Sequence, residues 1–333
     1  MFNQAVSPLK VGIVGTGYAA KKRAEAIKAD RRTELLAVTG NTPDRIEKFC
    51  QTYGTTAVDS WIRLIDIAEL DLIFICTINR DCGAIALTAI RAGKHVVVEY
   101  PLALEAKTAA EIIELARVKQ KLIHVEHMEI IGGLHSSIKQ NLPQIGRVFH
   151  ARYATISAQK SDRHSWKYNK NTFGFPLAAA LSRIHRLTDL FGKVQTVSCR
   201  NRYWDKNGSN YFTACLCNAQ LDFENGVVAE IVYGKGDVFH SSDRTFEIYG
   251  EEGTILFEGE KGKLIKNKSE TEIPVASRRG LFAKDTEMVL DYLFNQKPLY
   301  IQPQASLYAL QVANAAEKSS FLSKTVYLGN DLE

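Results

Sequence analysis

Residues 11–20 have the sequence VGIVGTGYAA, in which a short apolar run leads into two closely spaced glycines and then into a helical stretch. Gly15 permits the tight turn that this pattern needs, Gly17 lets a ligand approach the backbone, and Ala20 keeps the helix close to the sheet. The start of the helix offers unpaired N–H groups and the positive end of the helix dipole, which suit a diphosphate. The segment therefore predicts a dinucleotide site formed by Gly15, Thr16, Gly17, Tyr18, Ala19 and Ala20.

Beyond this segment, short apolar runs alternate with amphipathic helical stretches. We expect further strands at 34–39, 72–77, 95–98 and 122–125, with helices at 18–28, 43–53, 61–67, 82–92 and 106–120. Strands and helices that alternate at this spacing form βαβ units and hence a parallel sheet. The pattern predicts a Rossmann domain over residues 1–128.

After about residue 129 the pattern changes to consecutive strands joined by turns such as Glu224-Asn225-Gly226. We expect strands at 147–157, 194–203, 211–223, 227–233, 244–249 and 254–258, and helices at 176–190, 282–294 and 304–318. Consecutive strands without crossover helices form an antiparallel sheet. The predicted fold class is thus α/β, an N-terminal Rossmann parallel sheet followed by a C-terminal α+β domain, residues 129–333, which is built on a largely antiparallel sheet.

Composition narrows the classes of function. The chain has 333 residues and a net charge of +5, too small and too dispersed to indicate nucleic-acid binding. No apolar run reaches the roughly 18 residues of a membrane helix. No signal peptide is recognisable, and the six cysteines show no CxxC spacing. We expect a cytoplasmic protein with reduced thiols and no metal, whose oligomeric state the sequence leaves open. The basic run Lys21-Lys22-Arg23 is interpreted as a solvated helix face.

The segment after the second strand bears on the choice of nicotinamide cofactor. Residues 40–45 have the sequence GNTPDR, which lacks the carboxylate at 40–42 that would bind a ribose 2′-hydroxyl and repel a 2′-phosphate. Asn41 and Thr42 can donate hydrogen bonds, and Arg45 lies within a turn of them. The pattern favours NADP(H), although Asp44 opposes it. The alternative is that Arg45 is an ordinary exposed residue at a helix start.

Three segments resemble the glucose–fructose and inositol oxidoreductase (Gfo/Idh/MocA) family: the glycine motif, Cys76-Thr77-Ile78-Asn79, and the stretch AGKHVVVEYP at 92–101. The later antiparallel domain fits as well, so the resemblance covers essentially the whole chain. It implies a two-domain oxidoreductase in which the C-terminal domain, residues 129–333, binds the substrate. It also implies further contacts to the cofactor by Thr77, Ile78, Asn79, Glu99, Tyr100 and His127.

The chain departs from this family wherever the family's alcohol chemistry is performed. Tyr100 replaces the usual lysine, Cys82 the usual histidine, and Ser182 the usual aspartate of the later helix. Arg186 stands where the family has its second histidine. An alcohol dehydrogenase needs a base that is active near neutral pH, and arginine is always protonated. Oxidation of a sugar alcohol is therefore not expected.

Other segments are similar to the biliverdin reductases of photosynthetic bacteria, a group within the family. They are residues 166–168, 173–186 and 233–240, and residues 99–102 and 124–129 look like the corresponding segments of biliverdin reductases in general. The resemblance implies NADPH-dependent reduction of biliverdin to bilirubin, with hydride transfer to the C10 methine bridge. Arg183 and Arg186 lie on one helix face, where guanidinium groups can bind propionates or stabilise charge on the pyrroles. Arg186, Arg183, Tyr100 and Glu126 are the implied catalytic residues. Arg183, Arg186, Tyr100 and Phe173 are the implied contacts to the substrate.

Several alternatives stay open at this point. The chain could be another NADP-dependent oxidoreductase of the same fold that acts on a small carbonyl or imine, or a catalytically silent NADP(H) sensor. The arginines could form a solvent-facing pair that bridges to Asp189. Tyr100 could pack at a domain boundary, Phe173 could belong to the core, and Glu126 and His127 could be plain polar residues at strand ends.

Overall fold

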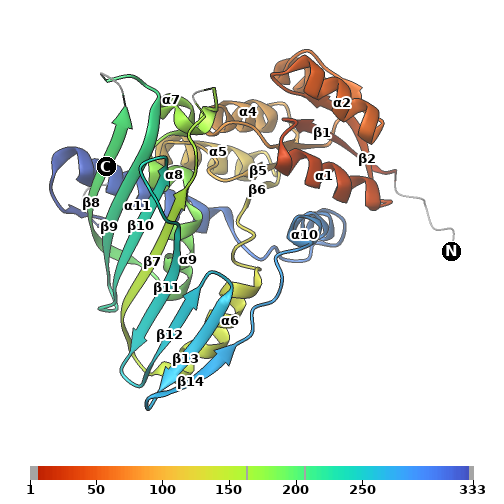
Figure 1. Cartoon of the computed structure of the whole chain (residues 1–333). Helices are drawn as coiled ribbons and strands as arrows, with labels where there is room; N and C mark the ends of the chain where they lie inside the picture. Colours follow the sequence, from red (N-terminus) through yellow and green to blue (C-terminus); the bar gives the residue numbers. More distant parts are fainter. Residues whose placement is uncertain (1–6, 163, 206–207, 330–333) are drawn as a thin grey trace, which may run out of the picture. The chain divides into compact units, whose positions relative to one another are not determined.

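The computed structural model describes residues 7–162, 164–205 and 208–329 (Figure 1). The chain divides into two compact units. The first comprises the described residues as far as Met128 together with Arg279–Gln304. The second comprises Glu129–Arg278 and the described residues from Ala305 onward. Each unit is built on one sheet.

The first unit contains a six-stranded sheet in the order β3-β2-β1-β4-β5-β6, and every pair of neighbouring strands is parallel. Its central strands are continuous apolar runs, as expected for strands that are covered by helices on both faces. The predicted parallel sheet is confirmed. The strands are β1 (Leu9–Val14), β2 (Thr33–Thr39), β3 (Thr56–Ala57), β4 (Leu72–Ile75), β5 (His95–Glu99) and β6 (Ile123–Glu126).

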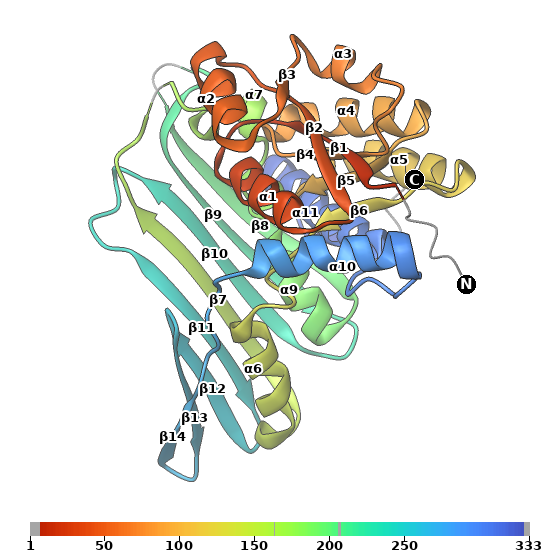
Figure 2. The same ribbon diagram turned by 90° about the vertical axis from the view of Figure 1, so that its right-hand side faces the viewer.

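The helices of this unit are α1 (Tyr18–Ala29), α2 (Pro43–Tyr53), α3 (Trp61–Ile65), α4 (Asn79–Arg91), α5 (Ala106–Val118) and α10 (Leu281–Asn295). Pro43 suits the first turn of α2, and Gly54, in the left-handed conformation with φ +63°, ends it. Helix α10 lies beside α1 (Figure 2). Sequence analysis assigned this helix to the second domain, whereas it packs in the first unit, because contacts to α1 depend on side chains distant in sequence.

The second unit contains a nine-stranded sheet in the order β14-β13-β12-β11-β7-β10-β9-β8-β15. All neighbours are antiparallel except β7 and β10, which pair in parallel. The prediction of a largely antiparallel sheet is confirmed. The strands are β7 (Val148–Ala158), β8 (Val194–Asp205), β9 (Phe212–Phe223), β10 (Val228–Gly236), β11 (Asp243–Gly250), β12 (Gly253–Glu258), β13 (Lys261–Lys266), β14 (Ser269–Ile273) and β15 (Val326–Tyr327).

Helices α6 (Gly133–Asn141) and α9 (Ser182–Phe191) lie along the same face of this sheet (Figure 2). The helix predicted at 176–190 is interrupted at Ala180, whose φ of −105° and ψ of 36° are not helical. As a result, α9 has its own start and Arg183 lies in its first turn. The helical segments are α6 (Gly133–Asn141), η1 (Leu142–Ile145), η2 (Trp166–Tyr168), α7 (Lys170–Phe173), α8 (Pro176–Ala179), α9 (Ser182–Phe191) and α11 (Pro303–Leu322).

Among the described residues, no helix combines the length and the apolar character that crossing a membrane requires.

Candidate active site

The turn between β1 and α1 depends on two glycines in different ways. Gly15 has a φ of +120°, and a Cβ atom there would lie 2.1 Å from the carbonyl oxygen of Cys76, so no other residue fits. Gly17 is the N-cap of α1, which no side chain caps, and a Cβ atom on it would meet nothing within 4 Å. The turn therefore leaves open backbone at a helix N-terminus, which fits a dinucleotide.

Because the strands of the first unit are parallel, the segments that follow them lie at one edge of the sheet, where doubly wound folds bind nucleotides. The structure brings all the predicted cofactor residues to this edge. Tyr18, Asn41, Thr42 and Arg45 are exposed there, and Ala20 is buried against the sheet. The residues are Gly15–Ala20 after β1, Asn41, Thr42 and Arg45 after β2, Thr77–Asn79 after β4, Glu99 and Tyr100 at the end of β5, and His127 after β6. Glu126, an implied catalytic residue, is the last residue of β6.

The ends of β5 and β6 place two aromatic rings against each other. Glu99 pairs with Glu126 in the parallel register. The residues that follow, Tyr100 and His127, stack with their ring centroids 5.2 Å apart and their planes within 6° of parallel. His127 and Glu126 are buried, and the Glu126 carboxylate accepts a hydrogen bond from the backbone N–H of Met128. Two of the predicted cofactor contacts thus form one stacked pair.

Arg23 is buried, so the predicted solvated face is wrong at this residue. Its Nε donates to Oε1 of Glu99 at 3.0 Å, and its Nη1 donates to the carboxylate of Asp285, 262 positions away in the chain. Asp285 also binds Nε2 of His124 and the hydroxyl of Tyr300. Sequence analysis missed these partners, since no local pattern connects α1 with a helix so distant in sequence.

In the second unit, Arg183 of α9 projects onto strands β7 and β10. Its Nε donates to Oγ1 of Thr155 at 3.2 Å, and its guanidinium lies 5.6 Å from the centre of the Tyr233 ring. The hydroxyl of Ser182 accepts a hydrogen bond from its Nη1 at 2.8 Å. Arg183 is half-buried, and these contacts fix its direction toward the sheet.

Arg186 lies one turn further along α9, and its guanidinium is 5.8 Å from the centre of the Tyr153 ring. Tyr153 in turn stacks on Phe246 with centroids 4.5 Å apart. Arg186 is only 6% exposed, yet its buried Nε and Nη1 have no hydrogen-bond partner among the described residues. Unpaired buried donors are costly, so each one calls for an explanation, and a functional role is one such explanation.

Asp189 is bound by its own partners in the second unit, which leaves no role for it as the acceptor of a solvent-facing arginine pair. Its Oδ2 accepts from Nε2 of His135 at 2.6 Å and from Lys139 at 2.7 Å. The hydrogen bond from His135, followed by that from Lys139, holds the pKa of Asp189 well below its ordinary value. Because Arg186 is buried as well, the alternative of a solvent-facing pair is wrong.

Phe173 lies in a cluster of buried aromatic rings with Tyr168 and Phe212. The ammonium of Lys235 sits 3.4 Å from the centre of the Phe173 ring and donates to the carbonyl oxygen of Lys167 at 2.6 Å. Burial lowers the pKa of Lys235 to about 8. Contact between Phe173 and a substrate stays a prediction.

Cys82, which replaces a histidine of the family pattern, belongs to the core. It is 1% exposed, and burial raises the pKa of its thiol to about 12. A thiol with such a pKa neither donates nor accepts a proton readily near neutral pH. All six cysteines are free.

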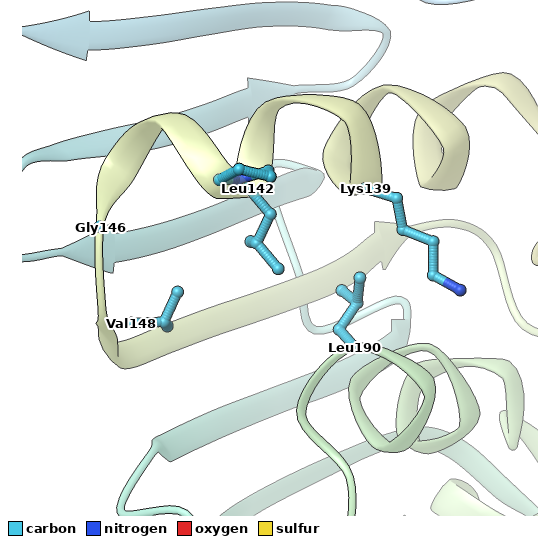
Figure 3. Close-up of a pocket in the computed structure, with 6 residues that line it drawn as sticks. Lys139, Leu142, Gly146, Val148 and Leu190 are labelled. Carbon is cyan, nitrogen blue, oxygen red and sulfur yellow. The ribbon is translucent and has the colours of Figure 1, made fainter.

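A pocket of about 320 Å³ lies elsewhere in the second unit, where Leu142, Val148 and Leu190 converge (Figure 3). Lys139 is the cation in its lining, and it is already paired with Asp189. Because the pocket offers no unpaired cation among the described residues that line it, it does not suit a ligand with two carboxylates.

Comparison with known proteins identifies the family of this chain and proteins that are similar to it. Residues 9–127 match the family model of the NAD-binding Rossmann fold of the Gfo/Idh/MocA oxidoreductases, and residues 138–328 match the model of their C-terminal α/β domain. Biliverdin reductase A of Mus musculus is 24% identical over 314 residues, which are 92% of this chain and 95% of the mouse protein. A dTDP-3,4-didehydro-2,6-dideoxy-α-D-glucose 3-reductase of Saccharopolyspora spinosa is also 24% identical, over 75% of this chain and 74% of that protein.

Among solved structures, the biliverdin reductase of Synechocystis sp. PCC 6803, crystallised with biliverdin and NADP+, is 53% identical, with a TM-score of 0.92. The match covers 94% of this chain and 99% of the Synechocystis chain. An oxidoreductase of Desulfitobacterium hafniense has the same fold at 19% identity, with a TM-score of 0.83 over 98% of this chain and 100% of the other. The chain is therefore an oxidoreductase of the Gfo/Idh/MocA family with a nicotinamide-cofactor domain, and within that family it is closely similar to a cyanobacterial biliverdin reductase.

Proposed function

We propose that this chain reduces biliverdin to bilirubin with NADPH as the reductant. The observation that carries the proposal is Arg186, a buried cation with two nitrogens that no described residue satisfies, held over an aromatic ring beside a second arginine. Biliverdin is a flat conjugated tetrapyrrole with two propionates, so it needs aromatic walls and fixed cations. The similarity to a reductase that was crystallised with biliverdin and NADP+ supports the same assignment.

The residues of the first unit fit the cofactor. The open backbone at Gly17 and the start of α1 would hold its diphosphate, and the exposed residues Asn41, Thr42 and Arg45 would hold the 2′-phosphate. The residues after β4, β5 and β6 would line the nicotinamide end: Thr77, Ile78, Asn79, Glu99, Tyr100 and His127. When bound, reduced nicotinamide supplies the hydride that biliverdin accepts at its C10 methine carbon.

The arginines act as fixed cations in this mechanism and not as bases. Arg183 and Arg186 bind the propionates or the pyrrole system, and they stabilise the negative charge that develops on the tetrapyrrole in the transition state. A proton must also reach a pyrrole nitrogen. Tyr100, Glu126, His127 and a water molecule held by Arg186 are the candidate sources for it.

The decisive experiment mixes the purified protein with biliverdin and either NADPH or NADH, between about pH 5 and 8, and follows the change from green to yellow. We expect conversion with NADPH and a much lower kcat/KM with NADH. Absence of any conversion with either nucleotide over this range would rule out the proposal.

The same preparation tests the two other functions that the sequence leaves open. Turnover of small carbonyls or imines without turnover of biliverdin would identify another reductase of this fold, such as the sugar 3-reductase of Saccharopolyspora spinosa. Stoichiometric binding of NADPH without turnover of any acceptor would identify a sensor.

A further inference from the structure

Buried polar groups connect helices α1 and α10 with the ends of strands β5 and β6. Arg23 and Asp285 are fully buried and ion-paired, and Nη1 of Arg23 also donates to Oγ1 of Thr286 at 3.0 Å. The Asp285 carboxylate has two further partners, Nε2 of His124 at 2.9 Å and the hydroxyl of Tyr300 at 2.7 Å. All of these residues belong to the first unit.

The charge on Asp285 fixes the direction of the hydrogen bonds. Burial alone would raise the pKa of this carboxyl, but Arg23 and then His124 hold it well below its ordinary value. An ionised carboxylate only accepts, so the Tyr300 hydroxyl must donate to it. The lone pairs of that hydroxyl then remain available to the backbone N–H of His127, which donates to it at 3.1 Å. Burial, followed by the charge of Asp285, raises the pKa of Tyr300, which keeps the phenol protonated.

The residue held in this way is half of the stacked pair at the predicted nicotinamide end. The ring of His127 lies parallel to that of Tyr100, which follows Glu99, and Glu99 is itself held by Arg23. Both residues of the stacked pair are therefore connected to the buried Arg23–Asp285 ion pair. His127 is connected through Tyr300, and Tyr100 through the preceding Glu99.

We propose that Tyr300 is a positioning residue for hydride transfer: its hydroxyl, oriented by Asp285, fixes the backbone at His127 and so holds the Tyr100–His127 stack in place for the nicotinamide. This inference rests on the proposed function. Tyr300 has no part in the glycine motif or in the arginine pair. It acts on the reaction only through the placement of His127.

The test compares Tyr300→Phe with Tyr308→Phe. Each substitution removes a hydroxyl that accepts a backbone N–H, from His127 in one case and from Val194 of the second unit, at 2.7 Å, in the other. Tyr300→Phe keeps the ring that packs edge-on against His124. Replacement of Asp285 would instead remove an ion-pair partner of the buried Arg23 and could prevent folding, so it is not used.

We expect both variants to melt at somewhat lower temperatures and to bind NADPH with nearly unchanged Kd. Only Tyr300→Phe should lower kcat for biliverdin, on the order of ten- to a hundredfold, because even a small displacement of reacting groups reduces the rate strongly. Its primary isotope effect with NADPH deuterated at the transferred position should rise, since hydride transfer becomes more fully rate-limiting. A purely structural role would leave this isotope effect at the value of the wild type.

A second readout needs no acceptor and separates this inference from the proposed function. The fluorescence anisotropy of bound NADPH reports how tightly the dihydronicotinamide ring is held, and it should fall in Tyr300→Phe but not in Tyr308→Phe. If the wild-type protein does not reduce biliverdin, this comparison still decides the role of Tyr300. Equal anisotropy in the wild type and Tyr300→Phe, or equal isotope effects and kcat in the two variants, would overturn the inference.

Discussion

Arg186 is a residue at which activity and stability can be separated. Its buried Nε and Nη1 satisfy no described group, so replacing the side chain breaks no hydrogen bond from those nitrogens. We predict that Arg186→Met lowers kcat/KM for biliverdin by about a hundredfold or more, the usual effect of losing a group that stabilises transition-state charge. The free energy of unfolding should stay the same or rise by about 1–3 kcal/mol, because a buried unsatisfied cation is removed.

Urea unfolding and steady-state kinetics on the same preparation check this prediction. Arg200→Met is a suitable control, since Arg200 is exposed on β8 and donates to the carbonyl oxygens of Cys199 and Ser323. Loss of stability in Arg186→Met that parallels its loss of activity would assign the residue a structural role.

Lys235 gives stability a dependence on pH. Its pKa falls from an ordinary 10.5 to about 8 through burial, so the folded protein binds this proton more weakly than the unfolded chain does. The cost of burying the charge is fully present below about pH 8, and it is relieved as the pH rises toward 10.5. A shift of this size corresponds to about 3 kcal/mol.

We therefore predict that wild type gains stability relative to Lys235→Met, by up to about 3 kcal/mol, between pH 7 and pH 10. Urea unfolding at several pH values measures the difference between the two proteins. Lys193→Met, which removes an ammonium at an exposed position directly before β8, should run parallel to the wild type. If the stability of Lys235→Met changed with pH in the same way as that of the wild type, Lys235 would not be the source of this pH dependence.

At the scale of elements, the two glycines of the β1–α1 turn have different roles, one in cofactor binding and one in folding. Gly17→Ala should fold normally, since its φ of −77° suits alanine and the new methyl group enters open space. It should nonetheless weaken NADPH binding by about tenfold or more, because the methyl group occupies the route of the diphosphate to the backbone. Gly15→Ala should lose stability by about 1–3 kcal/mol or more, given its left-handed conformation and its contact with Cys76.

Thermal melts and NADPH fluorescence titrations distinguish the two variants. Should Gly17→Ala bind NADPH as tightly as the wild type, the turn is not the diphosphate site.

Elements whose signal is local could be predicted from the sequence. The parallel sheet follows from apolar runs that alternate with helices. Arg183 and Arg186 were expected on one helix face because their spacing of three residues alone decides that.

Helix α6 and strands β13 and β14 were not predicted. β14, with the sequence SETEI, is mostly exposed and lacks a clear apolar alternation.

Contacts between distant elements could not be predicted. The burial of Arg23 depends on Asp285, and the rings beneath the arginines, Tyr233 and Tyr153, depend on the parallel register of β7 and β10. The interruption of the helix at Ala180 could likewise not be predicted, because the surrounding residues are good helix formers. Sequence patterns report which side chains are buried, whereas the partner of each is decided by tertiary packing.

At the scale of the whole molecule, residues 1–128 are not a complete folding unit. A chain that ends at Met128 lacks Asp285 and Thr286, and it leaves Arg23 without these partners. Arg23 keeps Glu99, but breaking a buried ion pair by removing one partner costs about 3–5 kcal/mol, a large part of the total stability of a domain. We predict that this fragment unfolds without cooperativity and does not bind NADPH, as measured by circular dichroism melts and fluorescence titration.

Adding residues 279–304 through a short glycine-rich linker should restore both properties. A fragment of residues 1–128 that melts cooperatively and binds NADPH by itself would contradict the prediction.

The chain passes from one unit to the other three times, after Met128, after Arg278 and after Gln304. A single proteolytic cut at any of these crossings leaves part of one unit still covalently linked to the other unit through the remaining crossings. The same topology restricts recombination within the family. A chimera that exchanges only the N-terminal half between relatives pairs the Arg23 of one parent with the α10 of the other, so viable crossovers are those that transfer both segments together or preserve this ion pair.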